Sequence, residues 1–199
     1  MKISLCQINL ENGNLKYNFQ KIKNYFEKEQ PYSDIVAFPE LSLTGYLLKD
    51  LVKNHDFLDD VLKFKAKVVE FTKEKKCALL FGCPILKNDK IFNSVIIAYD
   101  GEEIFSVDKH ILPNYEVFNE PRNFSESEKE SRVFEFKGEK IGILICEDAW
   151  HDHIPNVLAK KGATLFIIVN ASPYDLGKHK NRMEIANNIA KNITSLWHI

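Results

Sequence analysis

The sequence lacks a strong excess of charge, a long apolar run and an internal repeat. Its 27 Lys and Arg residues nearly balance 28 Asp and Glu residues, and the net charge of -1 gives no reason to expect nucleic acid or an anionic membrane as a partner. No apolar stretch approaches the roughly 20 residues of a membrane span. The apolar run at residues 3–6 is too short for a signal peptide. We therefore expect one domain, or one large piece of a domain, over residues 1–199.

Cysteines are few, and their spacing gives no sign of a structural cross-link. Cys6, Cys77, Cys83 and Cys146 form no C-x-x-C pair, and three of them lie in or beside apolar runs. This spacing predicts neither a disulfide framework nor a zinc site, and it favours a reducing cytoplasm. Residues 151–153 form a His-x-His pair, but no further ligand lies at a suitable spacing. We assign no metal to the chain.

Apolar residues recur at helical spacing in some segments and form short runs in others. Residues 15–26 and 57–69 repeat apolar side chains every three or four positions, which predicts two helices, the second capped by Asn54 or Asp56. A third helix is expected over residues 178–193, and residues 110–130 read as a long ordered loop. Asp100-Gly101 and Lys137-Gly138 predict the turns of two hairpins. Strands are expected at residues 3–10, 34–38, 78–81 (closed by Gly82), 91–99, 102–107, 132–136, 141–146 and 163–169.

Buried strands of the parallel type, combined with hairpins, imply a layered α/β protein with a mixed sheet. Two sheets packed face to face with helices outside would satisfy the pattern. A single doubly wound sheet would satisfy it too, and the pattern alone does not choose between them.

Three of the expected strands end next to a residue with useful chemistry. Glu40 follows residues 34–38, Lys109 follows residues 102–107, and Cys146 ends residues 141–146. A thiol can act as a nucleophile, a carboxylate as a base, and an ammonium can stabilise a tetrahedral anion. Each has a structural explanation on its own: a buried cysteine, a turn-capping glutamate, a solvated lysine. Their occurrence at three strand ends favours a catalytic site.

The segments around these residues resemble a known superfamily. Residues 38–41 (FPEL), 109–113 (KHILP) and 146–148 (CED) look like the three signatures of the nitrilase, or carbon–nitrogen hydrolase, superfamily. Residues 43–51, 109–124, 145–150 and 170–178 are similar to the glutaminase domain of glutamine-dependent NAD⁺ synthetases. Ureidopropionases and aliphatic amidases resemble these segments less closely.

The resemblance implies a four-layer α-β-β-α sandwich with mixed sheets, and a role for each matched residue. Glu40 would be the general base, Lys109 would stabilise the tetrahedral intermediates, and Cys146 would attack the side-chain amide of L-glutamine to form a thioester. A positive Lys109 beside Cys146 is also expected to lower the pKa of the thiol. The glutamine pocket maps onto Tyr115, Ser172 and Lys178, with Glu120, Glu147 and Trp150 lining or supporting it.

The resemblance also sets expectations about what the chain lacks. In the enzymes that it resembles the amidase domain continues further, and residues 195–199 read as the start of a next strand, so the fold is expected to be C-terminally incomplete. No Ser-Gly-Gly-x-x-Ser pyrophosphate loop is present. The chain itself is expected to need no cofactor, while ATP and Mg²⁺ would belong to a synthetase domain in the same or a separate chain. The intact enzyme is expected to be a homo-oligomer. The alternatives are a stand-alone amidase acting on another small amide and a non-catalytic fragment.

Overall fold

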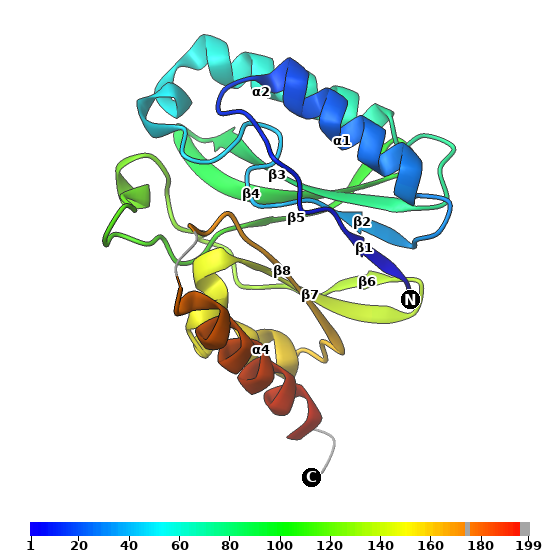
Figure 1. The fold of residues 1–199 in the computed structure, drawn as a ribbon, viewed down its shortest axis with the longest axis vertical. Helices are drawn as coiled ribbons and strands as arrows, with labels where there is room; N and C mark the ends of the chain where they lie inside the picture. The colour runs from blue at the N-terminus through cyan, green and yellow to red at the C-terminus, as the bar shows by residue number, and fades with distance from the viewer. Residues whose placement is uncertain (174–175, 196–199) are drawn as a thin grey trace. The chain divides into compact units, whose positions relative to one another are not determined.

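The computed structural model describes residues 1–173 and 176–195 (Figure 1). The chain divides into two compact units, Met1–Ser127 and Glu128–Ile199. Among the described residues, no helix combines the length and the apolar character that crossing a bilayer requires.

The first unit contains a mixed sheet with the strand order β1-β2-β3-β4-β5. β1, β2 and β3 run parallel to one another, whereas β3, β4 and β5 are joined as antiparallel hairpins. Asp100 and Gly101 connect β4 to β5 with φ values of 49° and 82°, the left-handed conformation of a tight hairpin turn, so this predicted turn is confirmed. The strands are β1 (Ile3–Leu5), β2 (Ile35–Ala37), β3 (Ala78–Lys87), β4 (Lys90–Tyr99) and β5 (Glu102–Asp108).

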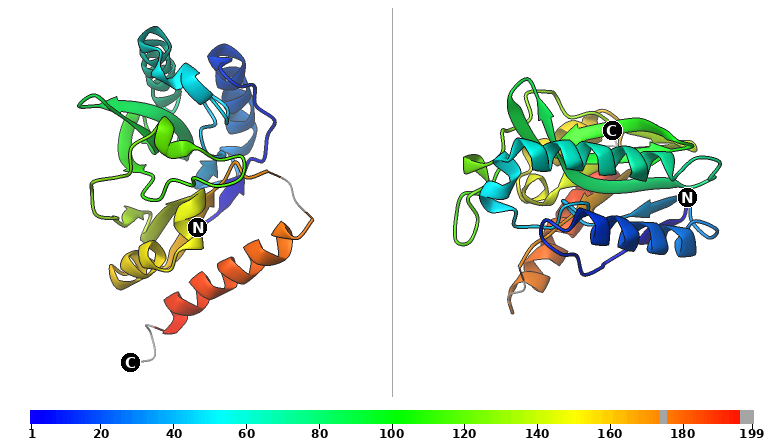
Figure 2. Two further views of the ribbon diagram at one scale, coloured as in Figure 1. Left: turned by 90° about the vertical axis from the view of Figure 1, so that its left-hand side faces the viewer. Right: turned by 90° about the horizontal axis from the view of Figure 1, so that it is seen from above.

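Two amphipathic helices, α1 (Leu15–Glu29) and α2 (His55–Glu70), cover one face of this sheet (Figures 1 and 2). The side chain of Asn54 accepts a hydrogen bond from Phe57 N at 3.0 Å, which identifies Asn54 as the cap of α2. Ile22 and Phe26 of α1 and Val61 of α2 are buried in the core above the sheet. The apolar spacing of the sequence therefore predicted both helices and their buried faces.

Two strand predictions were wrong in extent. β1 ends at Leu5, because only residues 3–5 pair with β2, and the chain then leaves the sheet to reach α1. β3 does not end at Gly82 but continues to Lys87, since each residue from Leu79 onward pairs with β4. Gly82 is therefore an interior strand residue, and its lack of a side chain lets the turn at Leu41 pack against β3.

A second small core lies beneath the loops that follow β2 and β5. The loops carry two short 3₁₀ helices, η1 (Lys49–Lys53) and η2 (Glu120–Arg122), so the predicted loop over residues 110–130 is ordered and contains one helical turn. Packing in this cluster fixes loop segments that are distant in sequence. Its buried members are Leu41, Leu48, Val52, Leu58, Leu112 and Phe124.

The second unit contains a three-stranded sheet with the order β6-β7-β8. The strands are β6 (Phe134–Phe136), β7 (Glu139–Ile145) and β8 (Leu165–Val169), with β6 antiparallel and β8 parallel to β7. Lys137 and Gly138, with φ values of 47° and 82°, form the predicted second hairpin turn. Both sheets are mixed, which confirms the predicted mixed α/β fold.

Helical segments follow β7 and β8. β7 runs directly into η3 (Cys146–Trp150), and α3 (His153–Lys160), which the sequence patterns did not predict, contacts β7. α4 (Lys178–Ser195) confirms the third predicted helix. The expectation that Ser195 begins a strand was wrong, because the helix includes it. Residues 196–199 of that expectation lie outside the described part of the chain.

Candidate active site

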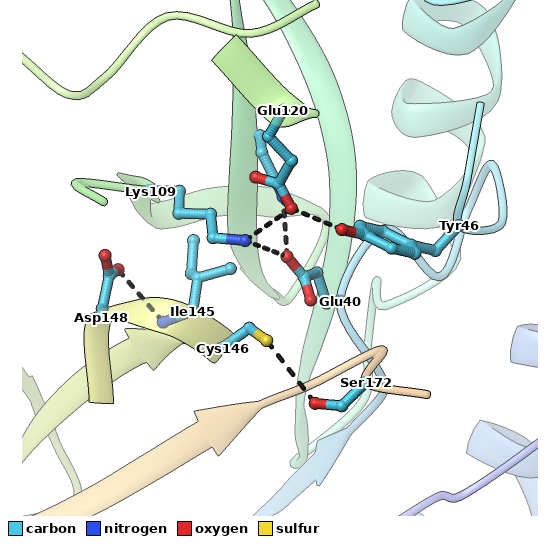
Figure 3. A network of polar contacts seen from close by, with 9 residues as sticks. Glu40, Tyr46, Lys109, Glu120, Ile145, Cys146, Asp148 and Ser172 are labelled. Carbon is cyan, nitrogen blue, oxygen red and sulfur yellow. Dashed lines mark hydrogen bonds and ion pairs between the residues drawn. The ribbon is translucent and has the colours of Figure 1, made fainter. Parts of the chain in front are cut away.

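A buried lysine between two carboxylates is the centre of the first unit's polar network (Figure 3). Lys109 directly follows β5 and is 0% exposed. Its Nζ donates to Oε1 of Glu40 and to Oε1 of Glu120, each at 2.8 Å. A buried ammonium is tolerated only when it is paired and hydrogen-bonded, and these two contacts supply that compensation. Glu40 and Lys109, predicted separately from two strand ends, therefore meet in the structure.

The turn that carries Glu40 is held by β3. Glu40 is 2% exposed, and the next residue, Leu41, has a φ of 48°, an unfavourable conformation for a residue with a branched side chain. Leu43 N donates to the carbonyl of Gly82 at 2.9 Å. A Cβ atom at Gly82 would lie 2.3 Å from Leu41 N, so only glycine lets the turn approach the strand this closely. Backbone packing thus presets the position of the Glu40 side chain.

Glu120, the first residue of η2, is 4% exposed and binds two donors through one oxygen. Besides Lys109, the hydroxyl of Tyr46 donates to Oε1 at 2.6 Å. Burial raises the pKa of Glu120 above its ordinary value, and the negative charge of Glu40 raises it further. The charge of Lys109 and the hydrogen bonds from Lys109 and Tyr46 oppose this rise. The network of two carboxylates and one ammonium is thus suited to holding a proton.

Cys146 of the second unit occupies a strained turn at the end of β7. It has a φ of 47° and is 6% exposed, and it begins η3 without any intervening loop. Oδ2 of Asp148 accepts from the backbone N–H of Ile145 at 3.2 Å, which closes the turn. Strained backbone of this kind clusters at functional positions and here presents a thiol at a strand end. The Sγ atom lies 3.6 Å from Oγ of Ser172, so these two predicted residues are neighbours (Figure 3).

The remaining predicted residues have different surroundings. Tyr115 is 47% exposed, and its ring packs edge-on against Phe118 with centroids 5.6 Å apart. Oε1 of Glu147 lies 3.3 Å from Nε2 of His151, a contact that the sequence did not predict. Trp150 is the last residue of η3, and Lys178 is the first residue of α4. Both are half-buried.

The structure brings the predicted residues together in two groups, one in each unit. Glu40, Lys109 and Glu120 form one group, and Cys146 and Ser172 form the other. That the two groups act on one substrate stays a prediction. Within the described residues, no cluster of three or more His, Cys, Asp or Glu side chains could hold a metal ion.

Two residues of the first network, Tyr46 and Asn93, were not predicted as site residues. Tyr46 lies within residues 43–51, which resemble the glutaminase domain of glutamine-dependent NAD⁺ synthetases. Asn93 donates from Nδ2 to Oε1 of Glu40 at 2.8 Å. The signal that could have identified Asn93 is a polar residue inside a largely apolar strand, because buried polar groups need partners.

Comparisons with known proteins identify the family. The family model for carbon-nitrogen hydrolase matches residues 2–192. The chain is 35% identical over 180 residues to a glutamine-dependent NAD(+) synthetase of Aquifex aeolicus, covering 90% of this chain and 31% of that protein. It is 33% identical over 195 residues to the synthetase of that name from Acinetobacter baylyi, covering 96% of this chain and 35% of that protein. The chain thus spans about a third of the length of these relatives.

Solved structures give the same result. A glutamine-dependent NAD⁺ synthetase from Acinetobacter baumannii matches with a TM-score of 0.89 and 31% identity, covering 96% of this chain and 36% of that one. An amidase of the nitrilase superfamily from Nesterenkonia AN1 matches with a TM-score of 0.78 over 91% of this chain and 69% of that one. At 19% identity this second likeness shows the fold alone. The chain belongs to the carbon–nitrogen hydrolase family, and its fold is that of the nitrilase superfamily.

Proposed function

We propose that this chain hydrolyses the side-chain amide of L-glutamine and is the glutaminase portion of a glutamine-dependent NAD⁺ synthetase. The main support for this proposal is the buried ammonium of Lys109. Its Nζ lies 2.8 Å from Oε1 of Glu40 and 2.8 Å from Oε1 of Glu120. Burying three ionisable groups is costly for stability, and such clusters are characteristic of catalytic sites. Similarity at 33–35% identity to proteins of that name supports the choice of glutamine.

The reaction needs a nucleophile, a base and a stabilising cation. Glu40 accepts the thiol proton of Cys146 as Sγ attacks the amide carbon, and the ammonium of Lys109 stabilises the oxyanion that forms. The tetrahedral intermediate collapses, Glu40 returns the proton to the leaving nitrogen, and ammonia departs from a γ-glutamyl thioester. Glu40 then takes a proton from water, which attacks the thioester and releases glutamate, and the proton restores the thiol. One glutamine and one water thus give one glutamate and one ammonia.

Recognition of glutamine requires groups that fit its α-ammonium and α-carboxylate. We assign this task to Tyr115, Ser172 and Lys178, with Glu120, Glu147 and Trp150 lining or supporting the pocket. The neighbouring positions of Ser172 and Cys146, and the exposure of the Tyr115 ring, are consistent with this assignment.

The ammonia would serve a synthetase reaction in a further domain. An ATP- and Mg²⁺-dependent domain, in the same or a separate chain, would use it to convert deamido-NAD⁺ into NAD⁺. That domain is the partner we propose, in a cytoplasmic and homo-oligomeric enzyme. No cofactor is required for the amide hydrolysis itself, since each proton transfer is assigned to a side chain.

A panel of amides tests the choice of substrate. L-Glutamine, acetamide and butyramide would be compared for ammonia release by the purified chain. A pocket that pairs with the amino-acid head group should favour L-glutamine by roughly 10²-fold or more in kcat/KM. Equal rates would identify a stand-alone amidase acting on small amides. A folded chain that hydrolyses none of the three would be a non-catalytic fragment.

A further inference from the structure

Asn93 is one of two buried polar residues on β4, the other being Ser94. Val95, Ile96 and Ile97 of the same strand are buried and apolar, and Asn93 is itself fully buried. Its Oδ1 has no hydrogen-bond partner among the described residues. A buried polar atom without a partner lowers stability, so the sheet alone gives no reason for an asparagine here.

The other polar atoms of Asn93 hold the two catalytic candidates of this unit. Nδ2 donates to Oε1 of Glu40 at 2.8 Å, and the backbone carbonyl accepts from the N–H of Lys109 at 2.8 Å. Oε1 of Glu40 therefore receives donors from both Asn93 and Lys109. One residue of β4 thus fixes the side chain of Glu40 and the backbone from which the Lys109 side chain extends.

We propose that Asn93 is a positioning residue for the general base, an inference that rests on the proposed function of Glu40. Glu40 alternates between carboxylate and carboxylic acid during each catalytic cycle. A neutral amide N–H can donate to an oxygen of either form without exchanging a proton with it. Asn93 thereby keeps the carboxyl group of Glu40 in one orientation through both proton transfers.

The test compares two substitutions of Asn93 with the loss of another buried polar group of the first unit. Asn93→Asp keeps the shape but removes the N–H donor, and Asn93→Ala removes the whole amide. Thr72 is also fully buried, but its hydroxyl bonds to the backbone of Val69 and Gly101 and not to the turn that carries Glu40, so Thr72→Val, which removes a buried polar group, is the control. Ammonia release from L-glutamine gives kcat and KM, and a thermal melt measures the stability of each protein.

We expect both Asn93 variants to melt cooperatively and to lose about 10- to 100-fold in kcat, with KM within about twofold of wild type. Thr72→Val should lose a similar amount of stability but keep kcat within about twofold. An Asn93→Ala protein with wild-type kcat would overturn the proposal. So would activity losses that follow stability in all three variants. If neither Asn93 variant melts cooperatively while Thr72→Val does, Asn93 is a structural residue and the proposal is wrong.

A second measurement separates this inference from the proposed function. If the wild-type chain releases no ammonia, the proposed function fails for this chain, and alkylation of Cys146 by iodoacetamide becomes the readout. A base positioned by Asn93 should make wild-type Cys146 react about tenfold faster than in Asn93→Ala. Equal alkylation rates would contradict the role of Asn93 whatever the substrate.

Discussion

The hydroxyl of Tyr46 donates to Oε1 of Glu120 at 2.6 Å, although 74 residues separate the two along the chain. The contact joins the loop after β2, which carries Glu40, to the loop after β5, which carries Glu120. Phe118 lies edge-on to Tyr46, with ring centroids 6.3 Å apart, so the tyrosine is braced on its apolar side as well. Both partners of the Lys109 ammonium are thereby held in place by the same pair of loops.

Removing the Tyr46 hydroxyl should weaken this connection. Tyr46→Phe is expected to cost about 1–2 kcal/mol of stability and to slow ammonia release by about tenfold, because a buried carboxylate loses one of its two donors. Thermal melts and steady-state rates measure the two effects. Tyr25→Phe, which changes a tyrosine on the exposed side of α1, is the control and should leave both unchanged. A Tyr46→Phe protein as stable and active as wild type would show that the hydrogen bond is dispensable.

The raised pKa of Glu120 predicts a specific pH dependence of stability. Below the ordinary value of 4.5 the carboxyl group is protonated in both the folded and the unfolded chain. As pH rises past 4.5, the unfolded chain loses the proton first, so the folded state loses stability until pH passes the folded pKa. Glu120→Gln does not titrate, and the stability of wild type relative to this variant should therefore fall as pH increases from 4.5.

Thermal melts of wild type and Glu120→Gln from pH 4 to pH 8 measure that difference. Glu135→Gln, at an exposed position on β6, controls for the loss of one carboxylate and should follow wild type at every pH. If the stability of wild type relative to Glu120→Gln instead rises with pH, the pKa of Glu120 is lowered in the fold.

Gly82→Ala should displace the turn that carries Glu40. The added Cβ would lie 2.3 Å from Leu41 N, so either β3 or the turn must shift. Overpacking of this kind typically costs about 1–3 kcal/mol, and a displaced base should also lower the rate of ammonia release. Gly177→Ala, where a Cβ meets nothing within 4 Å, is the control for stability. Unchanged activity in a folded Gly82→Ala protein would count against the close approach of strand and turn.

Cys146 should be the reactive thiol of this chain. Burial is the main cause that raises the pKa of Cys6 to about 11 and that of Cys83 to about 12. At pH 8 only about one in 10³ and one in 10⁴ of these two groups is therefore a thiolate. Brief treatment with iodoacetamide should give one adduct, on the peptide that carries Cys146, and Cys146→Ala should give none. Labelling of Cys83 at a comparable rate would contradict the prediction.

The sequence predicted those features that depend on neighbouring residues. Apolar periodicity located α1 and α2, the Asp100-Gly101 pair located a hairpin, and the ends of apolar runs located Glu40 and Lys109. Each of these follows from local rules of backbone conformation or helix burial.

Features that depend on distant residues were missed. Glycine usually weakens a strand, so Gly82 was taken as a strand end, whereas the approach of Leu41 requires it inside β3. The bond between Tyr46 and Glu120 depends on how two loops pack on the small core around Leu48 and Phe124, which no local pattern encodes. Asn93 was missed for the same reason, because its partner Glu40 lies 53 residues away in the sequence.

Ammonia release from L-glutamine by the purified chain, wild type against Cys146→Ala, measures whether the Cys146 thiol is the nucleophile. We predict steady release by wild type and loss of at least about 10³-fold in the variant, because without the thiol no thioester forms. Release that continues undiminished in Cys146→Ala would contradict the assignment of the nucleophile. A folded wild-type chain that releases no ammonia would contradict the proposal that this chain hydrolyses L-glutamine.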